Sequence, residues 1–188
     1  MDVYCLTVLE GQEWILPSDP NDFELFSALD GSPQTNWPEP VMQLLREDED
    51  GHERSYSDFP WLGAYAPMLT TTAAEALKKT LAPYGQLLPL RGEHHWLLNV
   101  TCVLDALDEQ KSKIVRFDDG AILAVEVYEF KRDVLAGHAI FKLPGRSSPV
   151  FLTRDLIEDI RHSGLRGVSF ERVWSESPSS APLRIDLR

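Results

Sequence analysis

Residues 150–174, with the sequence VFLTRDLIEDIRHSGLRGVSFERVW, contain a complete strand–helix–strand pattern. Thr153 follows an apolar strand-like run and supplies a side-chain oxygen suited to a helix N-cap. Asp155 lies in the first turn of the expected helix, and Arg161 and His162 lie in its last, which suits the helix dipole. The apolar stripe of the helix is Leu152, Leu156, Ile157 and Ile160. The pattern predicts a helix over about 154–163.

Gly164 is expected to end this helix. Glycine readily adopts the left-handed conformation that closes a helix, so Leu165 can fold back on the last turn. The following run, Val168–Trp174, has strand-forming residues with Val168 and Phe170 on one face. We therefore predict a strand on each side of the helix.

A second helix is predicted at about residues 72–82. Thr72 to Glu75 has the spacing of a capping box, and Pro83 stops the helix. Strand-like runs occupy 86–90, 96–103, 112–117, 121–130 and 139–143. Asp118-Asp119-Gly120 forms a hairpin turn between two of them. This order predicts an α+β fold with a mostly antiparallel sheet and two main helices.

The first sixty residues are less regular. Val3–Leu9 is strand-like, Trp14–Leu16 is its expected hairpin partner, and Phe23–Leu29 is an expected short helix. We predict a single domain over residues 1–188. Within it we expect an acidic subdomain or partner-specific region at 1–60, a core at 61–175 and a loose tail at 176–188.

The composition is that of an ordinary globular protein, with 43% hydrophobic and 26% charged residues. The apolar runs are too short to span a membrane, and Met1–Tyr4 lacks the basic start of a secretory signal. Cys5 and Cys102 each lie in apolar runs, which favours buried free thiols in a reducing compartment. These features predict a cytoplasmic protein.

The net charge of −12 is concentrated in one third of the chain. Residues 1–60 hold 14 Asp and Glu residues against two arginines, and the remainder holds equal numbers of both signs. An acidic surface repels nucleic acid and membranes and attracts a basic partner. A role in solubility alone is the alternative explanation.

No pattern of catalytic or metal-binding residues emerges, and we predict no cofactor, no metal and no enzymatic activity. His94 and His95 are adjacent, and neighbouring strand side chains point to opposite faces, so they cannot readily chelate one ion. Cys102 with either histidine is the alternative, a small hydrolase or transferase. The acids of 104–108 and 118–120 fit turns better than catalysis.

Aromatic residues among prolines lie close in sequence to the acidic run. Trp37 and Trp61 are therefore candidate interface anchors, because tryptophan often forms the buried centre of an interface with charges at its rim. Packing in the core is the alternative. The candidate partner-binding residues are Glu47, Asp48, Glu49, Asp50, Trp37 and Trp61.

Several segments in order resemble a bacterial immunity-protein family. They are Ala66-Pro67-Met68-Leu69, Gly85-x-x-Leu88-Pro89-Leu90, Leu98-Asn99-Val100, Leu104-Asp105-Ala106-Leu107-Asp108, Ile140-Phe141-Lys142-Leu143 and Gly164-Leu165-Arg166-Gly167-Val168-x-Phe170. The family is the eleventh numbered immunity family of polymorphic toxin systems, and the resemblance covers about residues 60–175. Its most specific pieces are the Gly-Leu-x-Gly-Val-x-Phe ending and the Leu-Asp-Ala-Leu-Asp segment.

The resemblance implies a protein that binds and neutralises a cognate toxin effector, such as one delivered by type VI or contact-dependent secretion. It implies no catalytic residues. An exposed edge strand could also support a homodimer. A generic protein-interaction scaffold without a toxin partner is the remaining alternative.

Overall fold

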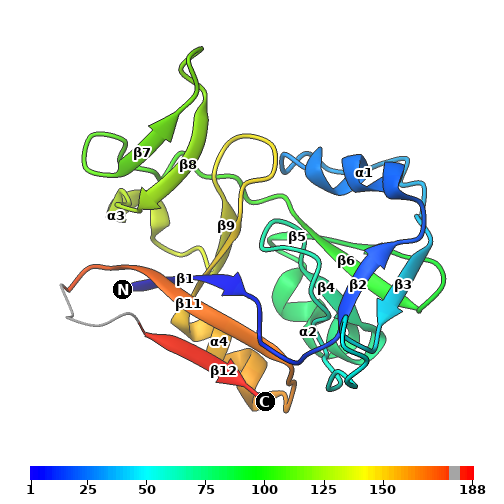
Figure 1. Ribbon diagram of the computed structural model, residues 1–188. Helices are drawn as coiled ribbons and strands as arrows, with labels where there is room; N and C mark the ends of the chain where they lie inside the picture. Colours follow the sequence, from blue (N-terminus) through cyan, green and yellow to red (C-terminus); the bar gives the residue numbers. More distant parts are fainter. Residues whose placement is uncertain (178–182) are drawn as a thin grey trace.

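The computed structural model describes residues 1–177 and 183–188 (Figure 1). In these residues the helices are α1 (Phe23–Ser27), α2 (Thr71–Leu81), α3 (Arg132–Leu135) and α4 (Arg154–His162), with a 3-10 turn at Pro20–Asp22. The strands are β1 (Asp2–Thr7), β2 (Trp14–Pro17), β3 (Met42–Leu45), β4 (Met68–Thr70), β5 (Gly85–Pro89), β6 (His95–Val100), β7 (Lys113–Arg116), β8 (Ile122–Val127), β9 (Ile140–Lys142), β10 (Val150–Thr153), β11 (Val168–Ser175) and β12 (Arg184–Leu187). The named strands pair antiparallel, which confirms the predicted α+β class and its two main helices.

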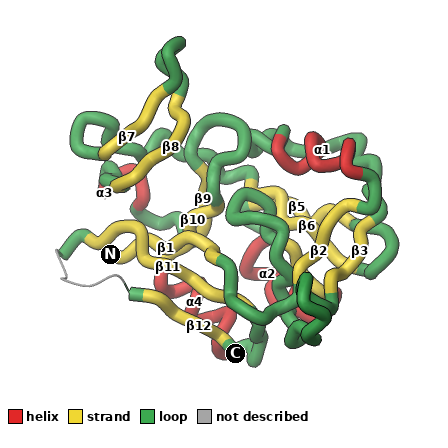
Figure 2. Tube along the Cα trace, viewed as in Figure 1, coloured by secondary structure: helices red, strands yellow, loops and turns green. Residues whose placement is uncertain are grey.

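A five-stranded sheet in the order β12-β11-β1-β10-β9 forms the largest layer (Figure 2). Its central strands β1 and β10 are packed on both faces, because alternate side chains enter two different cores. Tyr4 and Leu152 face one core, and their neighbours Val3 and Phe151 face the other. The sheet is therefore covered on both sides.

The first core lies between this sheet and the helices α2 and α4. The buried stripe of α4 is the predicted Leu156, Ile157 and Ile160, whereas the predicted Leu152 is buried in β10 instead. Thr153 occupies the N-cap position, but its side chain makes no cap hydrogen bond, and its hydroxyl donates to the Ala139 carbonyl (3.4 Å). The predicted capping box at Thr72 is wrong. Thr70 caps α2 instead, with its hydroxyl oxygen accepting from the backbone N–H of Ala73 (3.2 Å). Thr70, Thr71 and Thr72 all carry a side chain that can cap a helix. Because β4 ends at Thr70, the helix begins at Thr71 and Thr70 takes the cap position.

The second core, on the opposite face, is aromatic. Phe130 packs edge-on against Phe141 and Phe151, with ring centroids 5.8 and 5.4 Å apart. Tyr128 and Trp174 join the same cluster. Residues 104–107 and 128–135, together with the base of the β7–β8 hairpin, thus cover this face of the sheet.

A third core joins the two-stranded sheet β2–β3 and α1 to the sheet β4-β6-β5. The predicted hairpin between Val3–Leu9 and Trp14–Leu16 is wrong. The second segment pairs with β3, and β1 pairs with β10 and β11. Turn residues at 10–12 favour a hairpin locally, but the apolar faces of both strands are buried better by distant partners.

The predicted loose tail is wrong for Arg184–Leu187, which form β12 at the sheet edge beside β11. Leu187 is buried there, and Ser169 donates to the Asp186 carboxylate (2.6 Å). Residues 178–182 of the predicted tail lie outside the described part of the chain. Residues 1–60, the acidic first third, also contribute β1 to the centre of the main sheet. The boundary expected near residue 60 from the charge distribution therefore does not separate this region from the core.

Lys142 is almost completely buried, and its ammonium group donates to the backbone carbonyl of Leu29 (2.8 Å). Burial lowers the pKa of Lys142 from 10.5 to about 8, because a charged amine is poorly solvated in the core. The unfolded chain therefore binds the proton more tightly than the folded chain. Between pH 8 and 10.5 the folded chain loses this proton while the unfolded chain keeps it. The free energy of unfolding therefore rises with pH across this range.

We predict that the free energy of unfolding of the wild type, relative to Lys142→Met, rises by about 2 kcal/mol between pH 7 and pH 10. Cys5 and Tyr128, whose pKa values burial raises to about 12, destabilise the fold at high pH. Their effect is common to both proteins and cancels in the difference. Urea unfolding across this range tests the prediction, and a pH-independent difference would contradict it.

Candidate functional site

The predicted acidic run forms the tip of a short hairpin, which we call the acidic hairpin (residues 46–54). The backbone N–H of Asp48 donates to the carbonyl of His52, and that of Arg54 donates to Arg46 (2.9 and 2.7 Å). Gly51 has a φ of +79°, a conformation that glycine adopts without strain. The turn therefore holds the acids outward, and Glu47, Glu49 and Asp50 are exposed.

Asp48 differs from its neighbours because it organises the turn. One of its carboxylate oxygens accepts the backbone N–H groups of Asp50 and His52 (3.0 and 2.9 Å). The His52 backbone N–H is the largest cause of the lowered pKa of Asp48. Ligand atoms of Asp48, Asp50 and His52 lie within 4.8 Å of one another, but these hydrogen bonds explain the cluster without an ion. Glu47, Glu49 and Asp50 are the acids left for a partner.

The two candidate anchor tryptophans lie apart. Trp61 forms an isolated parallel β-bridge with Trp14. Trp14 in turn pairs with Leu45, the residue just before the acidic hairpin. Trp37 instead packs edge-on against Phe26, and its indole N–H donates to the Pro89 carbonyl (2.8 Å). Both are half-buried against hydrophobic cores. Their packing supports the core alternative, and their contact with a partner stays a prediction.

Two other acids of the first sixty residues are buried. A carboxylate oxygen of Glu13 accepts the backbone N–H of Ser57 (3.0 Å). The Asp58 carboxylate accepts from Tyr56, Thr70 and the backbone of Arg166. These charges satisfy internal donors, so the acidic surface available to a partner is smaller than the composition indicates.

The histidine pair is arranged as predicted, with His94 exposed and His95 buried. The ring of His95 lies 2.6 Å from the Glu93 carbonyl, and burial lowers its pKa. The histidine beside Cys102 is His138, with Sγ and Nδ1 3.4 Å apart, a contact that sequence reasoning missed. Burial raises the pKa of Cys102, which keeps it a thiol and makes it a poor nucleophile. This geometry gives the hydrolase alternative little support.

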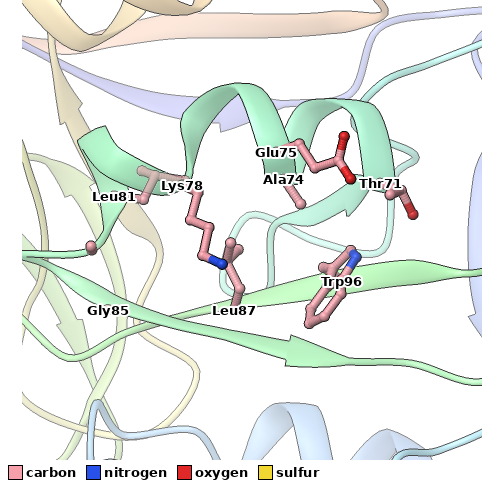
Figure 3. Close-up of a pocket in the computed structure, with 9 residues that line it drawn as sticks. Thr71, Ala74, Glu75, Lys78, Leu81, Gly85, Leu87 and Trp96 are labelled. Carbon is pink, nitrogen blue, oxygen red and sulfur yellow. The ribbon is translucent and has the colours of Figure 1, made fainter.

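A groove of about 420 Å³ lies between α2 and the strands β5 and β6 (Figure 3). Leu81, Leu87 and Trp96 provide apolar lining, and Glu75 and Lys78 extend from the helix. Thr71, at one end, donates its hydroxyl to the His94 carbonyl (2.8 Å). The groove was not predicted, and its two ionisable lining residues, Glu75 and Lys78, are exposed to solvent.

In the described part of the chain, no helix has both the length and the apolarity needed to cross a bilayer.

Residues 89–175 match a family model described as an immunity protein family, Imm11. No curated protein matches the chain. The family resemblance predicted from the sequence is thus confirmed over residues 89–175, which include the strand–helix–strand segment and the aromatic core.

Proposed function

We propose that this chain is an immunity protein that neutralises a cognate bacterial toxin by binding it directly in the cytoplasm of the producing cell. The observation that carries this proposal is the family match over residues 89–175. The geometry supports binding rather than catalysis, because the pKa of the Cys102 thiol is raised and the buried acids satisfy internal donors. A toxin delivered by type VI or contact-dependent secretion fits this role.

The acidic hairpin supplies a physical reason for fast binding. Toxins that act on nucleic acid carry basic clefts, and an anionic surface accelerates encounter with such a cleft. Glu47, Glu49 and Asp50 are exposed and make no side-chain ion pair among the described residues. We propose that these three acids accelerate the encounter with the toxin by long-range attraction. Asp48 stabilises the turn that presents them, and Trp61 lies near the base of the acidic hairpin.

Neutralising the hairpin by Glu47→Gln, Glu49→Gln and Asp50→Asn is expected to lower the association rate by about threefold to tenfold at low salt. The dissociation rate is expected to change little, because long-range steering acts before contact. Stopped-flow binding to the purified toxin encoded by the neighbouring gene measures both rates. The difference should vanish at high salt.

The matched control is Glu75→Gln, Asp133→Asn and Asp159→Asn, which removes the same charge from exposed positions elsewhere. An equal loss of rate in the control would assign steering to net charge rather than to the hairpin. Failure of the wild type to bind the toxin, or to protect cells that express it, would overturn the proposed function itself.

A further inference from the structure

The strands β7 and β8 form a two-stranded hairpin that extends away from the rest of the molecule (Figures 1 and 2). We call residues 113–127 the protruding hairpin. Large apolar side chains are exposed along it: Phe117 (54%), Ile122 (41%), Leu123 (55%) and Val127 (49%). Large apolar side chains exposed repeatedly along one hairpin mark a candidate contact surface.

Only the base of the protruding hairpin is packed. Ile114 and Val125 are paired across the strands and lie half-buried against the aromatic core. Below them, the Ser112 hydroxyl donates to the Glu129 carbonyl and accepts from the Glu129 backbone N–H (3.2 and 3.0 Å). An isolated hairpin is marginally stable in water. The exposed outer part therefore contributes little to the fold and is available for contact.

The strand pairing of the hairpin is irregular, which indicates contact through side chains. Its register shifts between Lys113 and Ile114 and again between Val115 and Arg116. Such irregularities interrupt the regular row of backbone groups that another strand would need for edge pairing. A partner is therefore expected to pack on the apolar side chains rather than extend the sheet.

The charges of the hairpin indicate the chemistry of the partner. Residues 108–129 hold six acids and three basic residues, and each basic residue already forms an ion pair. Lys113 pairs with Glu126, and Arg116 with Glu109, each at 2.6 Å. Asp118 and Asp119 remain without a basic partner at the tip, among the described residues. The surface is thus apolar with an acidic end.

We propose that the protruding hairpin is the surface on which the toxin is held, and that the toxin presents an apolar patch bordered by lysine or arginine. This inference rests on the proposed function and adds a location to it. A second copy of this chain fits less well, because it would bring together two acidic tips on molecules that each carry a net charge of −12. The hairpin lies within the family-matched residues and, in Figure 1, at the opposite end of the molecule from β3 and the acidic hairpin that follows it. The acidic hairpin is therefore assigned the long-range attraction before contact, and the protruding hairpin the lasting contact with the toxin.

The test is the double variant Phe117→Ser/Leu123→Ser, compared with Phe23→Ser/Val41→Ser, which removes two other exposed apolar side chains. The hairpin variant is expected to weaken binding of the purified neighbouring-gene toxin at least about 30-fold, mainly through faster dissociation. The control is expected to stay within about twofold. Urea unfolding of both variants checks that the fold is retained.

A second variant, Asp118→Lys/Asp119→Lys, tests the charge without touching apolar contacts. It is expected to weaken toxin binding by about tenfold or more at low salt. If the wild type binds the toxin and both hairpin variants bind equally well, the inference is wrong and the proposed function stands. A concentration-dependent dimer that the hairpin variants abolish, with toxin binding unchanged, would replace the toxin by a second copy. If the wild type does not bind, both proposals fail.

Discussion

Replacing Asp58 by alanine is expected to lower the free energy of unfolding by about 3 kcal/mol. Asp58 is 5% exposed, and one carboxylate oxygen accepts the Tyr56 and Thr70 hydroxyls (2.7 and 3.2 Å). The other oxygen accepts the backbone N–H of Arg166 (2.9 Å). Alanine would leave this part-buried N–H without an acceptor, while the Tyr56 hydroxyl can turn to water.

Urea unfolding measures this effect, with Asp50→Ala as the matched control. Asp50 is exposed, and its carboxylate accepts no hydrogen bond from the residues that the structure describes, so its loss is expected to change stability by less than about 0.5 kcal/mol. Equal effects of the two substitutions would show that the Asp58 hydrogen bonds contribute little. Asp58→Asn, which keeps the shape but loses the charge, should fall between them.

Asp58 also shows why the acidic region could be predicted only in outline. In sequence it resembles the other acids of the first sixty residues, and its decisive partner, Arg166, is 108 positions away. Exposure of the run at 47–50 was predictable because consecutive charges cannot pack together. Burial of Glu13 and Asp58 depends on distant backbone donors, for which the local sequence holds no signal.

The fold shows the same contrast: features set by nearby residues were predictable from the sequence, and features set by distant residues were not. The α4 helix and the turn at Asp118–Gly120 were predicted correctly because apolar spacing and turn-forming glycine act within a few residues. Strand partners were not predictable in this way. The apolar pattern of β1 is compatible with pairing to β2, yet β10 and β11 enclose it on both sides.

The protruding hairpin illustrates the limit for the binding surface. Its two strands and its turn were expected, but apolar strand residues normally indicate burial. Only the topology shows that β7 and β8 form a sheet of two strands, which leaves Phe117 and Leu123 uncovered. Exposure of this kind depends on what the rest of the chain fails to cover.

Gly167→Ala is expected to destabilise the fold by about 4 kcal/mol, a larger loss than that expected for Asp58→Ala. Gly167 has a φ of +82°, and a Cβ atom there would lie 2.4 Å from the Cα of Ser57. The Ser57 hydroxyl donates to the Gly167 carbonyl (2.7 Å), so neither backbone can move away without losing this bond. About 1 kcal/mol comes from the left-handed backbone and the rest from the overlap.

Gly164→Ala separates these two contributions. Gly164 has a similar φ of +73°, but no atom of residues 1–177 or 183–188 lies within 4 Å of its added Cβ. Its substitution is expected to cost only the backbone strain, about 1 kcal/mol. Urea unfolding of both variants gives the difference directly. A large difference would show that residues 57–58 and 166–167 clamp the acidic first third to the family-matched segment, whereas equal costs would mean that the contact at Ser57 yields easily.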